Sequence, residues 1–164
     1  MQEQLLTYFA AEKHESLVLV AVGIAAVALS FFLWRTDFKT MIYPLVAIGF
    51  IQLGVGGSVF LKTESQTATL TQQLRVEPER FQKEELARMT TVNSCFRIYK
   101  AIEILLLIGG IVLSYLSAQN MTWYPVAVGL IAQSAIMLVF DLFAEKRAYD
   151  YVAALERMLM WAPY

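Results

Sequence analysis

The sequence predicts an all-α integral membrane protein: a four-transmembrane-helix bundle from two tandem helical hairpins, with a cytoplasmic helical extension. The first observation is composition, because 58% of the 164 residues are hydrophobic and 16% are charged, whereas a soluble domain carries about 25% charged residues. The second is distribution. Four stretches contain almost no charge, and each is long enough to cross a hydrocarbon layer about 30 Å thick at about 1.5 Å per residue.

The predicted spans cover residues 16–34, 43–62, 101–118 and 123–144. They are expected to be helices, because a helix satisfies its own backbone groups in lipid and these stretches lack the alternation of barrel strands. Short loops join the first span to the second and the third to the fourth, so each pair forms a hairpin. Pro44 and Pro125 lie near the start of a span, where a missing N–H leaves no helical hydrogen bond unmade.

The basic residues predict the orientation of the spans. Of the 13 lysines and arginines, only Arg35 and Lys39 lie on the side of the two short loops. The positive-inside rule therefore places both termini and residues 63–100 in the cytoplasm. The predicted location is the inner membrane of a bacterium.

Five segments follow from these borders. They are an amphipathic N-terminal segment (1–15), a first transmembrane hairpin (16–62), a cytoplasmic helical hairpin (63–100), a second transmembrane hairpin (101–144) and an amphipathic C-terminal helix (145–164). Two arrangements are open for the terminal segments. Both amphipathic helices can lie in the inner headgroup layer of the membrane. Alternatively, the last helix packs along the cytoplasmic hairpin and shields its apolar stripe.

The cytoplasmic hairpin contains a helix that is predicted to begin near Pro78 and to continue into the third span. Its apolar residues recur at steps of three or four, as on one face of a helix: Leu86, Met89, Val92, Phe96 and Tyr99. The charges of this helix, Glu85 and Arg88 among them, alternate in sign. That pattern is typical of a solvated helix face.

The two hairpins share a pattern that suggests an internal duplication. Tyr-Pro at 43–44 and at 124–125 is followed at the same spacing by Gln52 and Gln133. Chance similarity between apolar segments is the alternative explanation. An amide in hydrocarbon needs a partner, so both glutamines are candidate intramembrane polar contacts. They either hydrogen-bond between the repeats or line a pore or polar cleft.

Glu103 and Asp141 are the acids that lie deepest in the predicted spans. Ionisable groups in a membrane point to function, so this pair is a candidate proton or ion site. Each lies about one turn from the cytoplasmic end of its span and close to basic residues, so interfacial ion pairing is the other interpretation.

Small residues mark candidate helix-packing faces, because they let two backbones approach closely. The positions are Gly49, Gly54, Gly57, Gly109, Gly110 and Ser114. The neighbouring helix is either in the same chain or in another subunit.

Several classes of function are disfavoured. The net charge of −1 gives no attraction for nucleic acid. One cysteine, Cys95, and one histidine, His14, are too few ligands for a zinc or iron–sulfur site. The sequence contains no catalytic constellation, so neither a cofactor nor an enzymatic activity is expected.

In architecture, the predicted protein is similar to the small inner-membrane immunity proteins of bacteria, which protect the producer of a toxin. The resemblance implies a non-enzymatic binding protein that neutralises a membrane-acting toxin or regulates another membrane protein. Its expected partners are the lipid bilayer, that membrane protein or toxin, and a second copy in a homo-oligomer. Two alternatives are a self-assembling channel or membrane-disrupting effector, and a small ion- or proton-coupled carrier that uses Glu103 and Asp141.

Overall fold

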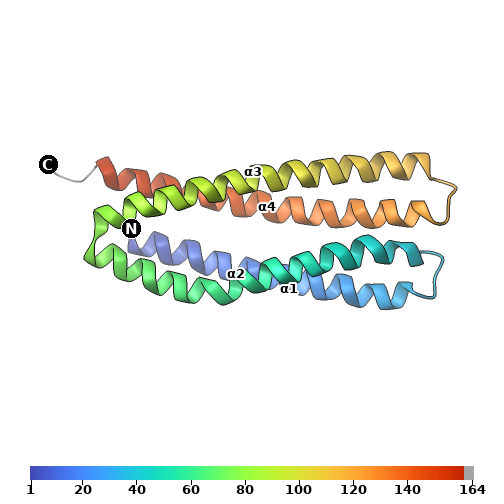
Figure 1. The fold of residues 1–164 in the computed structure, drawn as a ribbon, viewed down its shortest axis with the longest axis horizontal. Helices are drawn as coiled ribbons and strands as arrows, with labels where there is room; N and C mark the ends of the chain where they lie inside the picture. The colour runs from blue at the N-terminus through green and yellow to red at the C-terminus, as the bar shows by residue number, and fades with distance from the viewer. Residues whose placement is uncertain (161–164) are drawn as a thin grey trace.

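The computed structural model describes residues 1–160, and within this range the chain is helical throughout apart from short turns. The elements are α1 (Gln2–Leu33), the short 3-10 helix η1 (Lys39–Met41), α2 (Ile42–Val76), α3 (Pro78–Leu116) and α4 (Trp123–Met160). Figure 1 shows an elongated bundle in which α1 pairs with α2 and α3 pairs with α4. The predicted all-helical class is therefore confirmed.

The four long helices differ in the length of their apolar stretches. Among the described residues, three helical stretches are long and apolar enough to cross a membrane: Gln2–Leu33, Lys39–Val76 and Trp123–Met158. The third predicted span, residues 101–118, lies in α3, which is not among these three stretches. Helix α3 begins at Pro78 as expected, because proline is accepted in the first turn of a helix.

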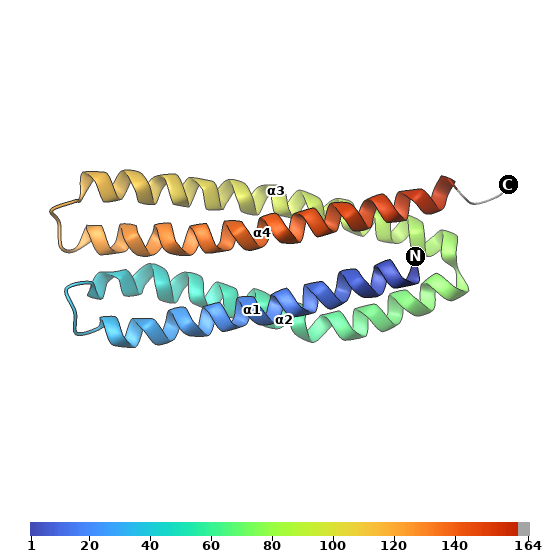
Figure 2. The same ribbon diagram turned by 180° about the vertical axis from the view of Figure 1, so that it is seen from behind.

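The two ends of the bundle differ in what they contain. One end carries the α1–α2 and α3–α4 loops, and the other carries the N-terminus, the α2–α3 turn and the end of α4 (Figure 2). We call residues 16–62 and 101–144 the loop half, and residues 1–15, 63–100 and 145–160 the terminal half. Each long helix runs through both halves without a break. Within residues 1–160, the five predicted segments are thus parts of four continuous helices, and residues 161–164 of the last segment lie outside the described residues.

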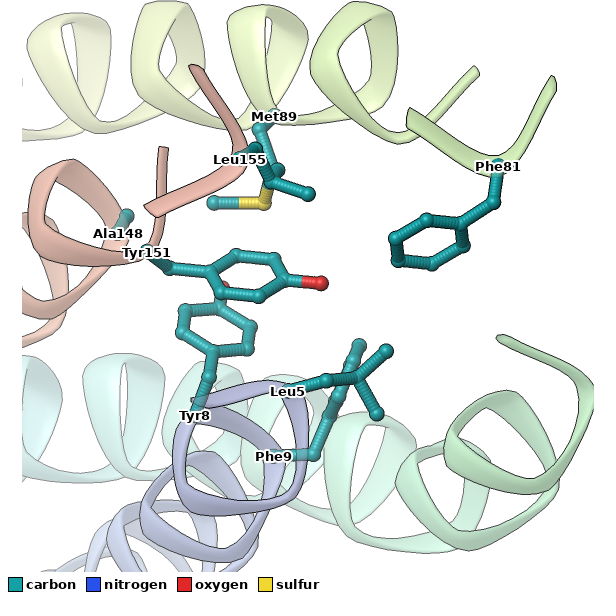
Figure 3. Packing of buried hydrophobic residues seen from close by; sticks show 8 residues of the cluster. All are labelled: Leu5, Tyr8, Phe9, Phe81, Met89, Ala148, Tyr151 and Leu155. Carbon is teal, nitrogen blue, oxygen red and sulfur yellow. The ribbon is translucent and has the colours of Figure 1, made fainter. Parts of the chain in front are cut away.

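The hydrophobic core lies in the terminal half, where α1, α3 and α4 meet (Figure 3). Its buried members are Leu5, Tyr8, Phe9, Phe81, Met89, Ala148, Tyr151 and Leu155. The rings of Tyr8 and Tyr151 stack with centroids 4.5 Å apart, and Phe9 packs edge-on against Tyr8 at 5.1 Å. Protein, rather than a headgroup layer, therefore covers the apolar face of the N-terminal segment. The last helix takes the second of its two expected arrangements and packs along α3.

Candidate functional site

Gln52 of α2 and Gln133 of α4 meet inside the loop half. The Nε2 of Gln52 donates a hydrogen bond of 2.9 Å to Oε1 of Gln133. Both side chains are buried, with 0% and 2% of their surface exposed. The bond joins the first hairpin to the second, and such a bond between helices is worth about 0.6–2 kcal/mol in lipid. Within the described chain the glutamines thus bind each other and leave no amide facing a pore or cleft.

A second contact joins the two hairpins at the loop end. The Thr40 hydroxyl donates a hydrogen bond of 2.6 Å to the carbonyl oxygen of Thr122. Close by, Gly129 of α4 lies against η1 and the start of α2, since a Cβ there would be 2.8 Å from Cγ of Pro44 and 2.9 Å from Cγ of Met41. In the loop half, the two hairpins are therefore joined by hydrogen bonds and by close backbone approaches.

Two of the predicted packing glycines lie between helices of this chain. A Cβ at Gly49 would be 3.3 Å from the carbonyl oxygen of Gly23, and a Cβ at Gly110 would be 2.8 Å from Cγ1 of Ile131. Gly56 belongs to the same α1–α2 contact, because its Cβ would be 2.8 Å from the carbonyl oxygen of Ser16. Gly23 was not among the predicted positions, although an isolated glycine inside an apolar span is a signal for close packing.

The other predicted packing glycines face away from the chain. Apart from its chain neighbours and the nearby backbone of its own helix, a Cβ at Gly54, Gly57 or Gly109 would meet no described atom within 4 Å. Ser114 is partly exposed, and its hydroxyl bonds to the carbonyl oxygen of Ile111 in its own helix. Glycine inside a helix is less favourable than alanine by about 0.8–1 kcal/mol. At these three positions no contact within the described chain offsets that loss.

Gly54 and Gly57 form part of a continuous stripe on α2. Positions 50, 54, 57 and 61 share one face of a helix because they are spaced by four, three and four residues. The flanking side chains of this stripe are exposed, with 61% of Phe50 and 78% of Leu61 accessible. We call these four residues the α2 glycine face. It is a flat strip of backbone with a large apolar side chain at each end.

Glu103 of α3 and Asp141 of α4 face each other inside the second hairpin. Their carboxyl groups lie within hydrogen-bonding reach of each other, and Glu103 has only 6% of its surface exposed. The predicted ion pairs go to other acids, since Lys100 binds Glu145 at 2.5 Å and Arg147 binds Glu15. The structure therefore brings the two predicted acids together without a basic partner of their own.

A charged network lies in the core of the terminal half. Glu85 has 2% of its surface exposed. It accepts two hydrogen bonds of 2.7 Å from the Arg88 guanidinium and one of 3.1 Å from the Tyr151 hydroxyl. Burial raises the pKa of Glu12 in the same network above its usual value, and it also raises the pKa of Tyr8. The solvated face predicted for Glu85 is therefore wrong, because α1 and α4 cover this part of α3.

Open grooves also lie on the terminal half. One of them, about 750 Å³, runs between α1 and α2 and includes Leu6, Phe9, Thr67 and Ala68 in its lining. Among the described residues, no group of three or more His, Cys, Asp or Glu side chains is placed to hold a metal ion.

In comparisons with known proteins, no family model, curated protein or solved structure matches the chain. The functional evidence for this chain therefore lies in its own surfaces and polar contacts.

Proposed function

We propose that this chain is a four-span protein of the bacterial inner membrane that binds a helix of another membrane protein, or of a membrane-inserting toxin, on its α2 glycine face. Both termini are cytoplasmic in this proposal, and the protein acts by binding rather than by catalysis. The observation that carries it is the open space at Gly54 and Gly57, which no described residue of the chain fills. An immunity-type role follows when the bound helix belongs to a toxin.

Support for membrane insertion comes from the surface of the loop half. Each of its four helices exposes large apolar side chains, including Phe32 of α1, Leu61 of α2, Leu105 of α3 and Phe143 of α4. Water would be a poor environment for so large an apolar surface, whereas lipid chains would cover it. The terminal half carries most of the lysines and arginines, which favours its placement in the cytoplasm.

Single-cysteine labelling of intact cells is expected to report this orientation. In a Cys95→Ser background, Asp37→Cys and Asn120→Cys place a thiol in the two loops, and Glu79→Cys places one at the α2–α3 turn. We expect a membrane-impermeant maleimide to label the two loop cysteines at once and the Glu79→Cys protein only after permeabilisation. The reverse pattern would invert the orientation, and immediate labelling of all three would argue against a span between them.

The glycine face suits a partner helix for a physical reason. Within lipid, helices associate through close packing and hydrogen bonds, and glycine lets two backbones approach. Gly49 and Gly56 of α2 already serve this purpose toward α1, whereas Gly54 and Gly57 on the outward side have no such neighbour. A second helix seated between Phe50 and Leu61 would offset the loss of helix propensity at both glycines.

Photocrosslinking in cells tests the proposal. A photoreactive phenylalanine analogue at Phe50 is expected to crosslink to another membrane protein, and Gly54→Leu together with Gly57→Leu is expected to abolish the adduct by filling the strip. The same analogue at Leu105 on the exposed surface of α3 is the matched control and should give no such adduct. Crosslinks to lipid alone from Phe50 would overturn the proposal.

The self-assembling channel is the competing candidate, because the same face also fits a second copy of the chain. An adduct with twice the mass of the chain, together with loss of membrane potential on induction, would favour it. Our proposal predicts an unchanged membrane potential at high expression. The buried Gln52–Gln133 bond supports this expectation, since it removes both amides from any surface that could line a pore.

A further inference from the structure

The contact between Glu103 and Asp141 is chemically incomplete as two ionised carboxylates. Both groups only accept hydrogen bonds when ionised. Oε2 of Glu103 and Oδ2 of Asp141 are each buried without a donor among the described residues. An unpaired buried acceptor is costly, and two carboxylates at close range repel each other. A donor is therefore missing from this site.

We propose that Glu103 and Asp141 bind one proton between them, so that one carboxyl group donates a hydrogen bond to the other across the α3–α4 contact. A single proton supplies the missing donor and reduces the charge of the pair from −2 to −1. It also needs no space, which suits a side chain as buried as Glu103.

The charged surroundings favour a proton over a metal ion. Lys100 on α3 and Glu145 on α4 are the charged neighbours, and they bind each other at 2.5 Å. From α1, Glu15 binds Arg147, and Lys13 binds Glu64 of α2. Among the described residues, neither carboxyl of the pair has a cation within ion-pair distance. Two carboxyl groups also offer few of the six or more oxygen ligands that Ca²⁺ and Mg²⁺ require.

The proton acts as a pH-dependent link between two helices. While it is bound, one hydrogen bond joins α3 to α4; when it leaves, two negative charges face each other across the same contact. The site lies on α3 and α4, whereas the glycine face lies on α2. The proposed shared proton therefore does not depend on the proposed partner helix.

Infrared spectroscopy of the purified full-length protein in lipid nanodiscs tests the assignment. Glu12→Gln is used as the background, because burial also raises the pKa of Glu12. In that background we expect a protonated-carboxyl band at neutral pH that shifts on transfer to deuterated water. Further substitution by Glu103→Gln or Asp141→Asn should abolish the band, because the remaining acid accepts a hydrogen bond from the new amide and ionises. Glu145→Gln is the matched control and should keep it.

Each contrary result has a distinct meaning. Absence of the band from the Glu12→Gln protein would overturn the proposal without reliance on any variant at the pair. A band that survives Glu103→Gln or Asp141→Asn would mean that one acid holds a proton of its own. A band that sodium chloride removes at constant pH and choline chloride leaves intact would make the site a cation site instead. Circular dichroism of each variant establishes that helix content is retained.

Discussion

Arg88→Met is expected to lower the free energy of unfolding by about 3–5 kcal/mol, because it leaves the buried carboxylate of Glu85 without its charged partner. The Arg88 guanidinium donates two hydrogen bonds of 2.7 Å to Glu85. It also lies over the ring of Phe9, 5.6 Å from the centroid. The Tyr151 hydroxyl would remain as a donor, but a neutral hydroxyl does not balance the charge. Reversible unfolding in denaturant, followed by circular dichroism, measures the effect.

Arg80→Met provides the matched control for this prediction. Arg80 also binds two acids, Glu77 and Glu84, at 3.1 and 2.8 Å. Its side chain is 64% exposed, and exposed ion pairs contribute about 0–1 kcal/mol. The double variant Glu85→Gln with Arg88→Met should recover much of the lost stability by removing the buried charge. Equal losses for Arg88→Met and Arg80→Met would contradict the buried network.

Two adjacent glycines of α2 are expected to respond to alanine in opposite directions. Gly56→Ala places a Cβ 2.8 Å from the carbonyl oxygen of Ser16 and 2.9 Å from Cγ2 of Val20. The backbone of α1 cannot yield as a side-chain end can, so we expect a loss of about 1–3 kcal/mol. Gly57→Ala meets open space and should gain up to about 1 kcal/mol from helix propensity.

Measurement of the two alanine variants side by side separates packing from propensity. Both add one methyl group at neighbouring positions of the same helix, so lipid, detergent and denatured-state effects are closely matched. A loss of similar size in both would mean that Gly57 also lies against a helix, which would then belong to a second molecule. If neither variant lost stability, the result would contradict the close α1–α2 approach at Gly56.

The helical class and the two hairpins follow from the sequence because they depend on composition over long windows. Apolar length marks three helical stretches as able to cross a membrane, and Pro78 marks the start of α3. The shared spacing of Gln52 and Gln133 also brought out the pair that the structure joins. Such signals average over many residues or repeat along the chain, so they can be recognised without knowledge of the tertiary contacts.

The direction in which each residue faces could not be predicted in the same way. Gly56 and Gly57 differ by one position, about 100° around the helix, and only the location of α1 decides which one is covered. Glu85 belongs to a run of alternating charges that looks solvated, and its burial requires that Tyr151 from the far end of the chain covers it. Long-range packing therefore determined the details that local pattern left open.

Each long helix is continuous, so a movement at one position is transmitted along its whole length. At about 1.5 Å per residue, the 35 residues of α2 form a rod about 52 Å long, and no proline interrupts it after Pro44. A tilt of about 5° at one end would displace the other end by about 4–5 Å. A partner helix that tilts α2 by about 5° at Gly54 would displace Arg75, which lies 21 residues and about 32 Å farther along the same helix, by about 3 Å.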